Sequence, residues 1–224
     1  MYGYQGDPSI MRIRSLLLTA VLAVSGTAAA QTASAPLLPK PAEFYFDADA
    51  NTAKPVIVVR ETGEVAMQKL SRILERKAGA DAEAAQLAHL AMEAGRVDVG
   101  RQLYARSLSG LDATDGIWRS VMWNYGWDLY RAGDDKGALE QWRTLYASRT
   151  VTASWVPPTF ALALWSMGHK DEAVQWYAAA VRTEPMQWNS SAQYARLLPA
   201  WTEDERKMLA EVQAAWAANP PKWP

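Results

Sequence analysis

The residue types that most often carry catalysis are scarce in this chain. Its 224 residues include no cysteine and only two histidines, which excludes thiol nucleophiles, disulfides and cysteine-ligated metal centres. We therefore predict a non-enzymatic protein with no catalytic residue, no metal site and no cofactor. An enzyme with an unrecognised site stays as an alternative, because side chains that are distant in sequence can meet in space.

Two groups of carboxylates could suggest a metal site or catalysis, but each has a simpler interpretation. Asp47, Asp49 and Asn51 alternate like the first ligands of a calcium loop, but Val58 stands where that loop needs a bidentate glutamate. The run Glu203–Glu205 follows a threonine, and this pattern forms a capping box at the start of a helix. We predict no calcium site at the first group and a helix start at the second.

Tryptophan is the informative residue type. The chain contains 11 tryptophans, and all of them lie at or after Trp118. Because tryptophan, tyrosine and arginine dominate binding hot spots, this distribution favours binding over catalysis. The formal net charge is only −1, so no general field steers the chain onto nucleic acid, and we predict no nucleic-acid partner.

Residues 1–30 have the pattern of an export signal, with translation expected to begin at Met11. A short basic start precedes the apolar run Leu16–Val24, and Ala28–Ala30 supplies a cleavage pattern. The run is shorter than the ~20 residues that span a bilayer, and the chain has no cysteine to carry a lipid. We expect a Sec signal peptide, a periplasmic or secreted protein that is not a lipoprotein, and no transmembrane segment after cleavage.

Residues 31–60 predict an extended arm, and residues 61–80 predict a capping helix. The arm contains four prolines, each of which lacks an N–H donor and holds its predecessor extended. Within the arm, Val56–Val59 is a β-like run, and a single strand cannot form a sheet alone. We expect this run to pack as part of the arm and to offer a surface for self-association or docking.

Beyond residue 80, units of two helices and a short turn recur. Gly95, Gly133 and Gly168 each separate two segments with helical apolar spacing. Glycine enters the left-handed conformation of a tight turn without a Cβ clash. The second segments cover residues 97–108, 136–146 and 171–181. Recurrence of this kind is typical of a repeat array.

The unit that covers residues 154–187 resembles the tetratricopeptide repeat (TPR) family. Its bulky and small residues fall at the places that the family's pattern of about 34 residues assigns to them. These residues are Phe160, Ala161, Leu164, Gly168, Ala173, Tyr177, Ala180 and Pro185. Small residues in this pattern let two helices approach closely, and bulky residues fill the space around the contact.

Two earlier units match the same pattern less fully. The unit that begins at residue 119 carries Gly126, Ala138 and Trp142, and the unit that begins at residue 81 has Gly100 where the pattern prefers alanine. The resemblance implies an all-α fold, an α-solenoid of about three helix pairs over residues 81–187. The expected caps are the helix in residues 61–80 and the helices of residues 188–224, which end in a tail. A non-repetitive helical bundle is the alternative.

The resemblance also implies a concave groove on the first helix of each unit. The residues at groove-facing places that we assign to a binding site are His89, Trp123, Asn124, Trp127, Tyr130, Arg131 and Trp165. Trp155 is left out, because Pro157 and Pro158 are expected to start their helix after it. The other interpretation of these tryptophans is that they fill the core between the units.

We therefore expect an exported TPR-like module that binds a peptide, or an extended segment of another protein, in an aromatic groove. Its expected partner belongs to the cell envelope, in assembly or maintenance. The alternative in another class is a module that binds glycan or peptidoglycan by stacking tryptophan rings on sugars.

Overall fold

The computed structural model describes residue 1, residue 3, residues 35–41 and residues 46–222. The chain divides into two units, residues 1–35 and residues 36–224. The expected signal peptide and the expected start at Met11 fall almost entirely outside the described residues. Among the described residues, no helix combines the length and the apolar character needed to cross a membrane.

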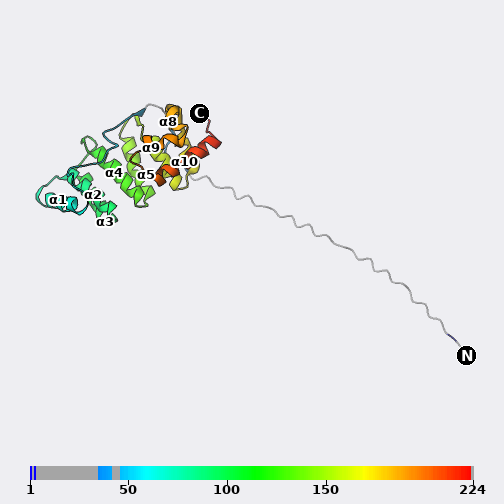
Figure 1. The fold of residues 1–224 in the computed structure, drawn as a ribbon, viewed down its shortest axis with the longest axis horizontal. Coiled ribbons are helices and arrows are strands. Elements are labelled where there is room, and N and C mark those ends of the chain that lie inside the picture. Colours follow the sequence, from blue (N-terminus) through cyan, green and yellow to red (C-terminus); the bar gives the residue numbers. More distant parts are fainter. Residues whose placement is uncertain (2, 4–34, 42–45, 223–224) are drawn as a thin grey trace. The chain divides into compact units, whose positions relative to one another are not determined.

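The second unit is mostly helical, which confirms the prediction of an all-α chain (Figure 1). In chain order its helices are α1 (Gly63–Arg76), α2 (Asp81–Glu93), α3 (Val97–Ser109), α4 (Trp118–Arg131), α5 (Asp135–Ala147), α6 (Val156–Ser166), α7 (Lys170–Thr183), α8 (Pro185–Trp188), α9 (Tyr194–Leu197) and α10 (Glu203–Ala218). A short 3-10 helix, η1 (Ser191–Gln193), precedes α9. The bounds of the long helices differ by a few residues at most from the segments expected from apolar spacing.

The helices between α2 and α7 pack in consecutive pairs. The contacts join α2 to α3, α4 to α5 and α6 to α7, and each pair also contacts the next. Helix α1 packs on α2 at one end, and α10 packs on α6 and α7 at the other. Gly95, Gly133 and Gly168 connect the helices of each pair with φ angles of 74°, 82° and 82°. These angles explain why the turns require glycine.

Small residues are buried within the helix pairs. Ala88, Ala138, Ala161 and Ala173 are fully buried. A Cβ on Gly126 would collide with the indole ring of Trp142, which lies on the partner helix. At this point α4 and α5 therefore approach each other closely because Gly126 carries no side chain.

The C-terminal helices follow the expected signals. The Thr202 hydroxyl accepts a hydrogen bond from the Glu205 N–H at 3.2 Å, and the Glu205 carboxylate accepts one from the Thr202 N–H at 2.6 Å. This reciprocal pair is the expected capping box at the start of α10. Helix α9 ends at Leu197, shortly before Pro199, as the proline predicts.

The described part of the N-terminal arm crosses several helix pairs. A two-residue strand that the sequence did not predict, β1 (Phe46–Asp47), pairs in parallel with β2 (Thr152–Ala153). Farther along, Val59 is buried, whereas Ile57 and Val58 are exposed. The arm is therefore extended and partly buried against the helices.

Candidate functional site

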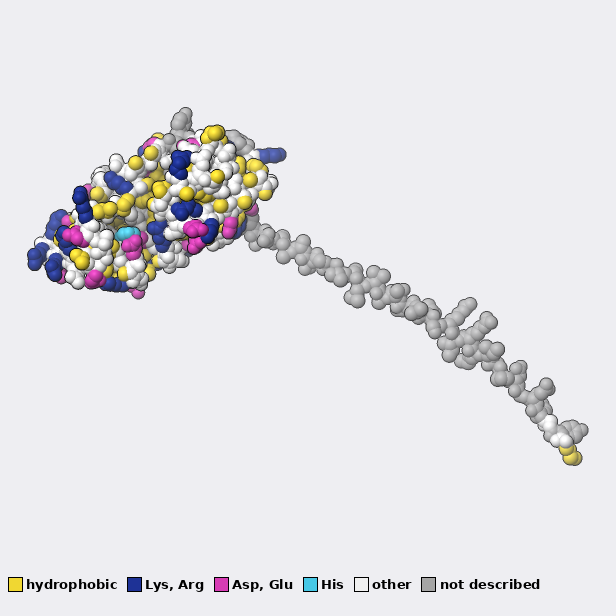
Figure 2. Space-filling model, viewed as in Figure 1, with side chains coloured by type: hydrophobic (Ala, Val, Ile, Leu, Met, Phe, Trp, Pro, Cys, Tyr) yellow, Lys and Arg dark blue, Asp and Glu magenta, His cyan; other side chains and the backbone are white. Residues whose placement is uncertain are grey.

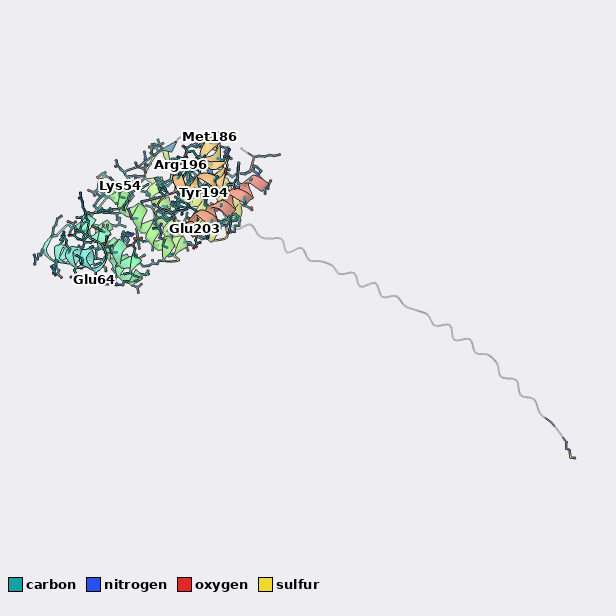
Figure 3. All side chains as sticks on the ribbon, viewed as in Figure 1. Lys54, Glu64, Met186, Tyr194, Arg196 and Glu203 are labelled. Atoms are coloured by element: carbon teal, nitrogen blue, oxygen red, sulfur yellow. The ribbon has the colours of Figure 1, made fainter. Side chains whose placement is uncertain are left out.

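A cavity of about 510 Å³ lies between the arm, the helices α2, α4 and α6, and the segment that follows α7. We name it the tryptophan pocket. Its tryptophans are Trp123, Trp127, Trp155, Trp188 and Trp201, and its polar residues include Lys54, His89, Glu93, Asn124, Asp128, Arg131, Thr159, Glu184 and Gln187. Lys54, which comes from the arm, is labelled in Figure 3. The face viewed in Figure 2 shows hydrophobic side chains in its middle, with acidic and basic side chains around them.

The five tryptophans belong both to the core and to the pocket wall. None of them is more than 9% exposed. Four of the rings contact one another, with centroids 4.7 Å apart for Trp123 and Trp155 and 5.0 Å apart for Trp127 and Trp201, and Trp188 packs on Tyr177 and Tyr194. Each ring therefore exposes only a small part of its surface, and the rings together form a rigid aromatic wall of the pocket.

Five of the seven residues assigned from sequence line the pocket: His89, Trp123, Asn124, Trp127 and Arg131. The Arg131 side chain is held in place by the Glu205 carboxylate, which accepts from its Nε at 2.9 Å. Its guanidinium also lies over the Trp127 ring, 5.1 Å from the centroid. Arg131 therefore supports the wall of the pocket as well as lining it.

Tyr130 and Trp165 do not line the pocket. The Tyr130 hydroxyl lies 3.4 Å from the Met208 sulfur, and the Trp165 indole N–H donates to Glu211 at 2.9 Å. Both partners belong to α10, which packs across α6 and α7. The assignment of these two rings to a groove assumed that their helix face is open, and α10 covers it.

Three tryptophans of the pocket were missed from the sequence. Trp155 was excluded because two prolines follow it, and indeed α6 begins at Val156. Its ring nevertheless packs on Trp123, and its N–H donates to Asp49 at 3.1 Å. Trp188 and Trp201 lie in the segments after α7, where no repeat place assigns them to a groove.

The faces of α2 and α4 beside the pocket hold the arm by its main chain. Gln86 accepts hydrogen bonds from the N–H groups of Val58 and Val59, at 2.7 and 2.8 Å, and donates to the Val59 carbonyl at 2.7 Å. Asn124 donates to the Lys54 carbonyl at 2.8 Å. These side chains recognise extended backbone without regard to the side chains that it carries.

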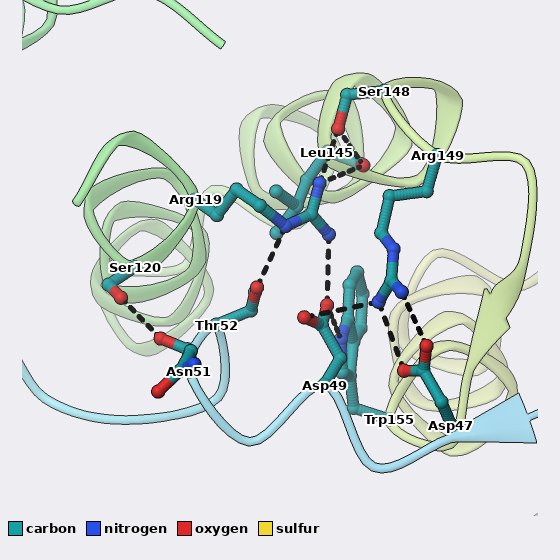
Figure 4. Close-up of polar contacts among 10 residues, drawn as sticks. All are labelled: Asp47, Asp49, Asn51, Thr52, Arg119, Ser120, Leu145, Ser148, Arg149 and Trp155. Atoms are coloured by element: carbon teal, nitrogen blue, oxygen red, sulfur yellow. Dashed lines mark hydrogen bonds and ion pairs between the residues drawn. The ribbon is translucent and has the colours of Figure 1, made fainter. Parts of the chain in front are cut away.

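Ion pairs anchor the arm where it meets α4 and α5 (Figure 4). Arg119 contacts the Asp49 carboxylate at 2.9 Å, and Arg149 contacts both Asp49, at 3.1 Å, and Asp47. Burial raises the pKa of Asp49, but hydrogen bonds from Arg119, Trp155 and Thr52 outweigh it and hold the pKa below its ordinary value. The carboxylates once compared with calcium ligands therefore serve as partners for arginine.

A buried carboxylate positions the imidazole in the pocket wall. Asp128 accepts hydrogen bonds from the Tyr104 hydroxyl at 2.6 Å and from His89 Nδ1 at 2.9 Å. The hydrogen bond to Asp128 raises the pKa of His89. On the other side of the ring, His89 Nε2 lies 3.5 Å from the Glu93 carboxylate. The cluster holds a histidine that favours its charged form.

Several polar groups of the pocket have no partner. In the described part of the chain, the Thr159 hydroxyl makes no hydrogen bond although the residue is almost completely buried. The indole N–H groups of Trp123, Trp127 and Trp201 likewise have no acceptor among the described residues. They are not sealed in the core, because the sealed and unpartnered side-chain atoms lie on other residues. The three indole N–H groups are therefore donors that a ligand in the pocket can satisfy, whereas the Thr159 hydroxyl is sealed within the fold.

Within the described residues, no group of three or more histidine, aspartate or glutamate side chains is arranged to hold a metal ion. Comparison of the chain with protein-family models, with curated proteins and with solved structures gave no match.

Proposed function

We propose that this chain is an exported, non-enzymatic interaction module that binds a short extended segment of another protein in the tryptophan pocket. In this proposal the three helix pairs of residues 81–187 form a short solenoid of the TPR kind, between a capping helix and the C-terminal helices. The setting that we propose is assembly or maintenance of the cell envelope.

The observation that carries the proposal is the way the arm is bound. Gln86 on α2 and Asn124 on α4 hold an extended segment through main-chain hydrogen bonds. Thr159 on α6 occupies the position in the third unit that is equivalent to Gln86 and Asn124, and its hydroxyl has no partner. The open pocket is thus a continuation of a surface that already binds extended backbone in the same chain.

The size of the pocket suits a short segment. Cavities that hold small ligands have volumes of about 300–1,000 Å³, and this pocket has about 510 Å³. The arm covers the neighbouring faces of α2 and α4, so a long peptide has no continuous track. A few residues, anchored by one or two side chains, would fill the space.

Glycan binding is supported less well by the same geometry. A sugar that stacks on tryptophan needs an open ring face, and no ring of the pocket is more than 9% exposed. The rings meet at steep angles, 79° for Trp123 and Trp127 and 66° for Trp127 and Trp201. One ring therefore covers the face of the next, and what remains open suits hydrogen bonding more than stacking.

Selection from a displayed library of random peptides tests the proposal with the purified protein. Selected peptides are then synthesised and titrated against two variants, Glu93→Trp and Glu140→Trp. Glu93 lines the pocket and its side chain is 61% exposed, whereas Glu140 lies outside it on α5 and is 56% exposed. We expect binding to weaken at least about tenfold in Glu93→Trp, since the added ring blocks the pocket, and to stay unchanged in Glu140→Trp.

Failure to select any peptide, or equal binding by both variants, would contradict the proposal. Co-sedimentation with purified peptidoglycan tests the glycan alternative. Retention on peptidoglycan that Glu93→Trp abolishes would favour that alternative instead. Cell fractionation tests export separately, and full-length protein in the cytosol would contradict that part.

A further inference from the structure

We infer that the segment bound in the tryptophan pocket is rich in proline. The inference depends on the proposed function and names the chemistry of its ligand. It follows from the kind of hydrogen-bonding groups that the pocket leaves free, and from the segment that the chain itself places at the pocket rim.

The free groups are mainly donors. Trp123, Trp127 and Trp201 each carry an indole N–H that has no acceptor among the described residues, and an indole nitrogen can only donate. Each of these three residues is more than nine-tenths buried, so a fixed acceptor in the pocket would pair its N–H better than mobile water does. The missing partners are oxygen atoms.

Two carboxylates of the pocket are already engaged. Asp128 accepts from Tyr104 and His89. Glu184 accepts from the Gln187 side chain at 2.7 Å and from the Trp188 indole at 3.4 Å. A ligand with many N–H groups would compete with these internal donors. A ligand that brings carbonyl oxygens and few N–H groups would pair the free donors and leave the carboxylates undisturbed.

Proline-rich segments have this composition. Each proline lacks the backbone N–H but keeps its carbonyl. In the polyproline II conformation the carbonyls make no internal hydrogen bonds and point outward. Such segments dock into aromatic grooves as preformed, extended helices, with little loss of conformational entropy. The pocket supplies the unpaired donors for these carbonyls, on indole rings that are otherwise covered by their neighbours.

The arm shows the same chemistry at the rim of the pocket. The carbonyl that accepts from Asn124 belongs to Lys54, and the next residue is Pro55. Lys54 and Pro55 both line the pocket. The carbonyl before a proline is therefore already recognised by the helix face that continues into the pocket.

Fluorescence polarisation with two labelled peptides tests the inference. One peptide has nine residues in three Ala-Pro-Pro repeats, and the other has alanine in place of every proline; both are capped at each end. We expect the proline peptide to bind at least about tenfold more tightly. Trp201→Phe removes one donor and should weaken its binding about three- to tenfold, the size of one lost hydrogen bond.

Trp165→Phe is the matched control. Trp165 donates to Glu211, away from the pocket. Circular dichroism of every variant verifies that the fold is retained. Equal effects of Trp165→Phe and Trp201→Phe would overturn the inference.

The outcome also separates the inference from the proposed function. Equal binding of the proline and alanine peptides would overturn the inference and leave peptide binding in place. Binding of selected library peptides that lack proline, without binding of the proline peptide, would have the same meaning. Absence of binding by any peptide, selected or designed, would overturn both.

Discussion

Gly126 on α4 faces the indole ring of Trp142 on α5 so closely that no other residue fits. A Cβ added at Gly126 would lie within 3.0 Å of three atoms of that ring. Trp142 is completely buried, and its N–H donates to the Trp123 carbonyl at 3.4 Å. The glycine thus lets α4 and α5 close around a ring that also fixes the wall of the pocket.

We expect Gly126→Ala to destabilise the protein although alanine is the better helix former. The gain in helix propensity is about 1 kcal/mol, whereas forcing an extra carbon into a filled core costs roughly 1–3 kcal/mol and more where a rigid ring must move. The net loss in the free energy of unfolding should be about 1–2 kcal/mol. Urea denaturation followed by circular dichroism measures it.

Two other glycines provide the comparison. At Gly100 an added Cβ would meet mainly the flexible side chain of Met92, so Gly100→Ala should cost less than Gly126→Ala. At Gly116 nothing lies within 4 Å, and Gly116→Ala should be close to neutral. A Gly126→Ala protein as stable as the Gly116→Ala protein would show that the Trp142 ring is free to move aside.

Thr159→Val should stabilise the fold. The hydroxyl is buried and has no hydrogen-bond partner, and an unsatisfied buried polar group costs about 1–3 kcal/mol. Valine has nearly the same shape, so a gain of about 1 kcal/mol should raise the melting temperature by roughly 2–4 °C. Differential scanning calorimetry of the unliganded protein makes the measurement.

Thr183→Val is the control for that gain, because the Thr183 hydroxyl donates to the Ala179 carbonyl at 2.9 Å. It should leave the melting temperature unchanged or lower it slightly. If Thr159→Val lowers the melting temperature instead, the hydroxyl has a structural partner, such as an ordered water.

Much of the helical framework could be predicted from the sequence, because its signals are local. Each of the turns at Gly95, Gly133 and Gly168 needs a positive φ, and this need is visible as glycine between two apolar-periodic segments. Similarly, the capping box at Thr202 involves only the four consecutive residues 202–205. Signals of this kind depend on backbone conformation and do not require knowledge of distant contacts.

The pocket could be predicted only in part, since its outer walls come from distant segments. The groove-facing places of one helix identified Trp123 and Trp127. No sequence pattern near Trp201 indicates that this residue lines the cavity, and none near Trp165 indicates that α10 covers it. The arm posed the same difficulty, because the pairing of Asp49 with Arg119 joins residues 70 positions apart.

Asp49 should be the residue on which the arm most depends. Its side chain is 10% exposed and pairs with Arg119 and Arg149, so Asp49→Ala leaves two arginines without that partner and should cost about 3 kcal/mol. Asp49 also has a φ of 38°, which asparagine tolerates better than alanine. Asp49→Asn should therefore cost less, about 1–2 kcal/mol.

Asp47→Ala is the matched control on the same arm. The Asp47 side chain is 43% exposed, and a pair so accessible to water contributes about 1 kcal/mol or less. Chemical denaturation of the three variants ranks them. Equal losses for Asp47→Ala and Asp49→Ala would contradict the view that the buried carboxylate anchors the arm.

Protonation of His89 should make the stability of the fold depend on pH. The hydrogen bond from Nδ1 to Asp128 raises the pKa of His89 above its ordinary value of 6.5, and the nearby Glu93 adds to the effect, while burial and Arg131 oppose it. A histidine whose pKa is raised by folding stabilises the folded state when it is protonated. Its contribution is complete below pH 6.5 and is lost as the pH rises through the higher folded-state pKa.

His89→Gln tests this prediction, because glutamine can still donate to Asp128 but does not titrate. The free energy of unfolding of the unchanged protein should fall relative to that of His89→Gln as the pH rises above 6.5. Denaturation at a series of pH values gives both curves, and NMR titration of the imidazole gives the pKa directly. Parallel curves would mean that desolvation of the ring cancels its bond to Asp128, and a measured pKa below 6.5 would mean that desolvation outweighs that bond.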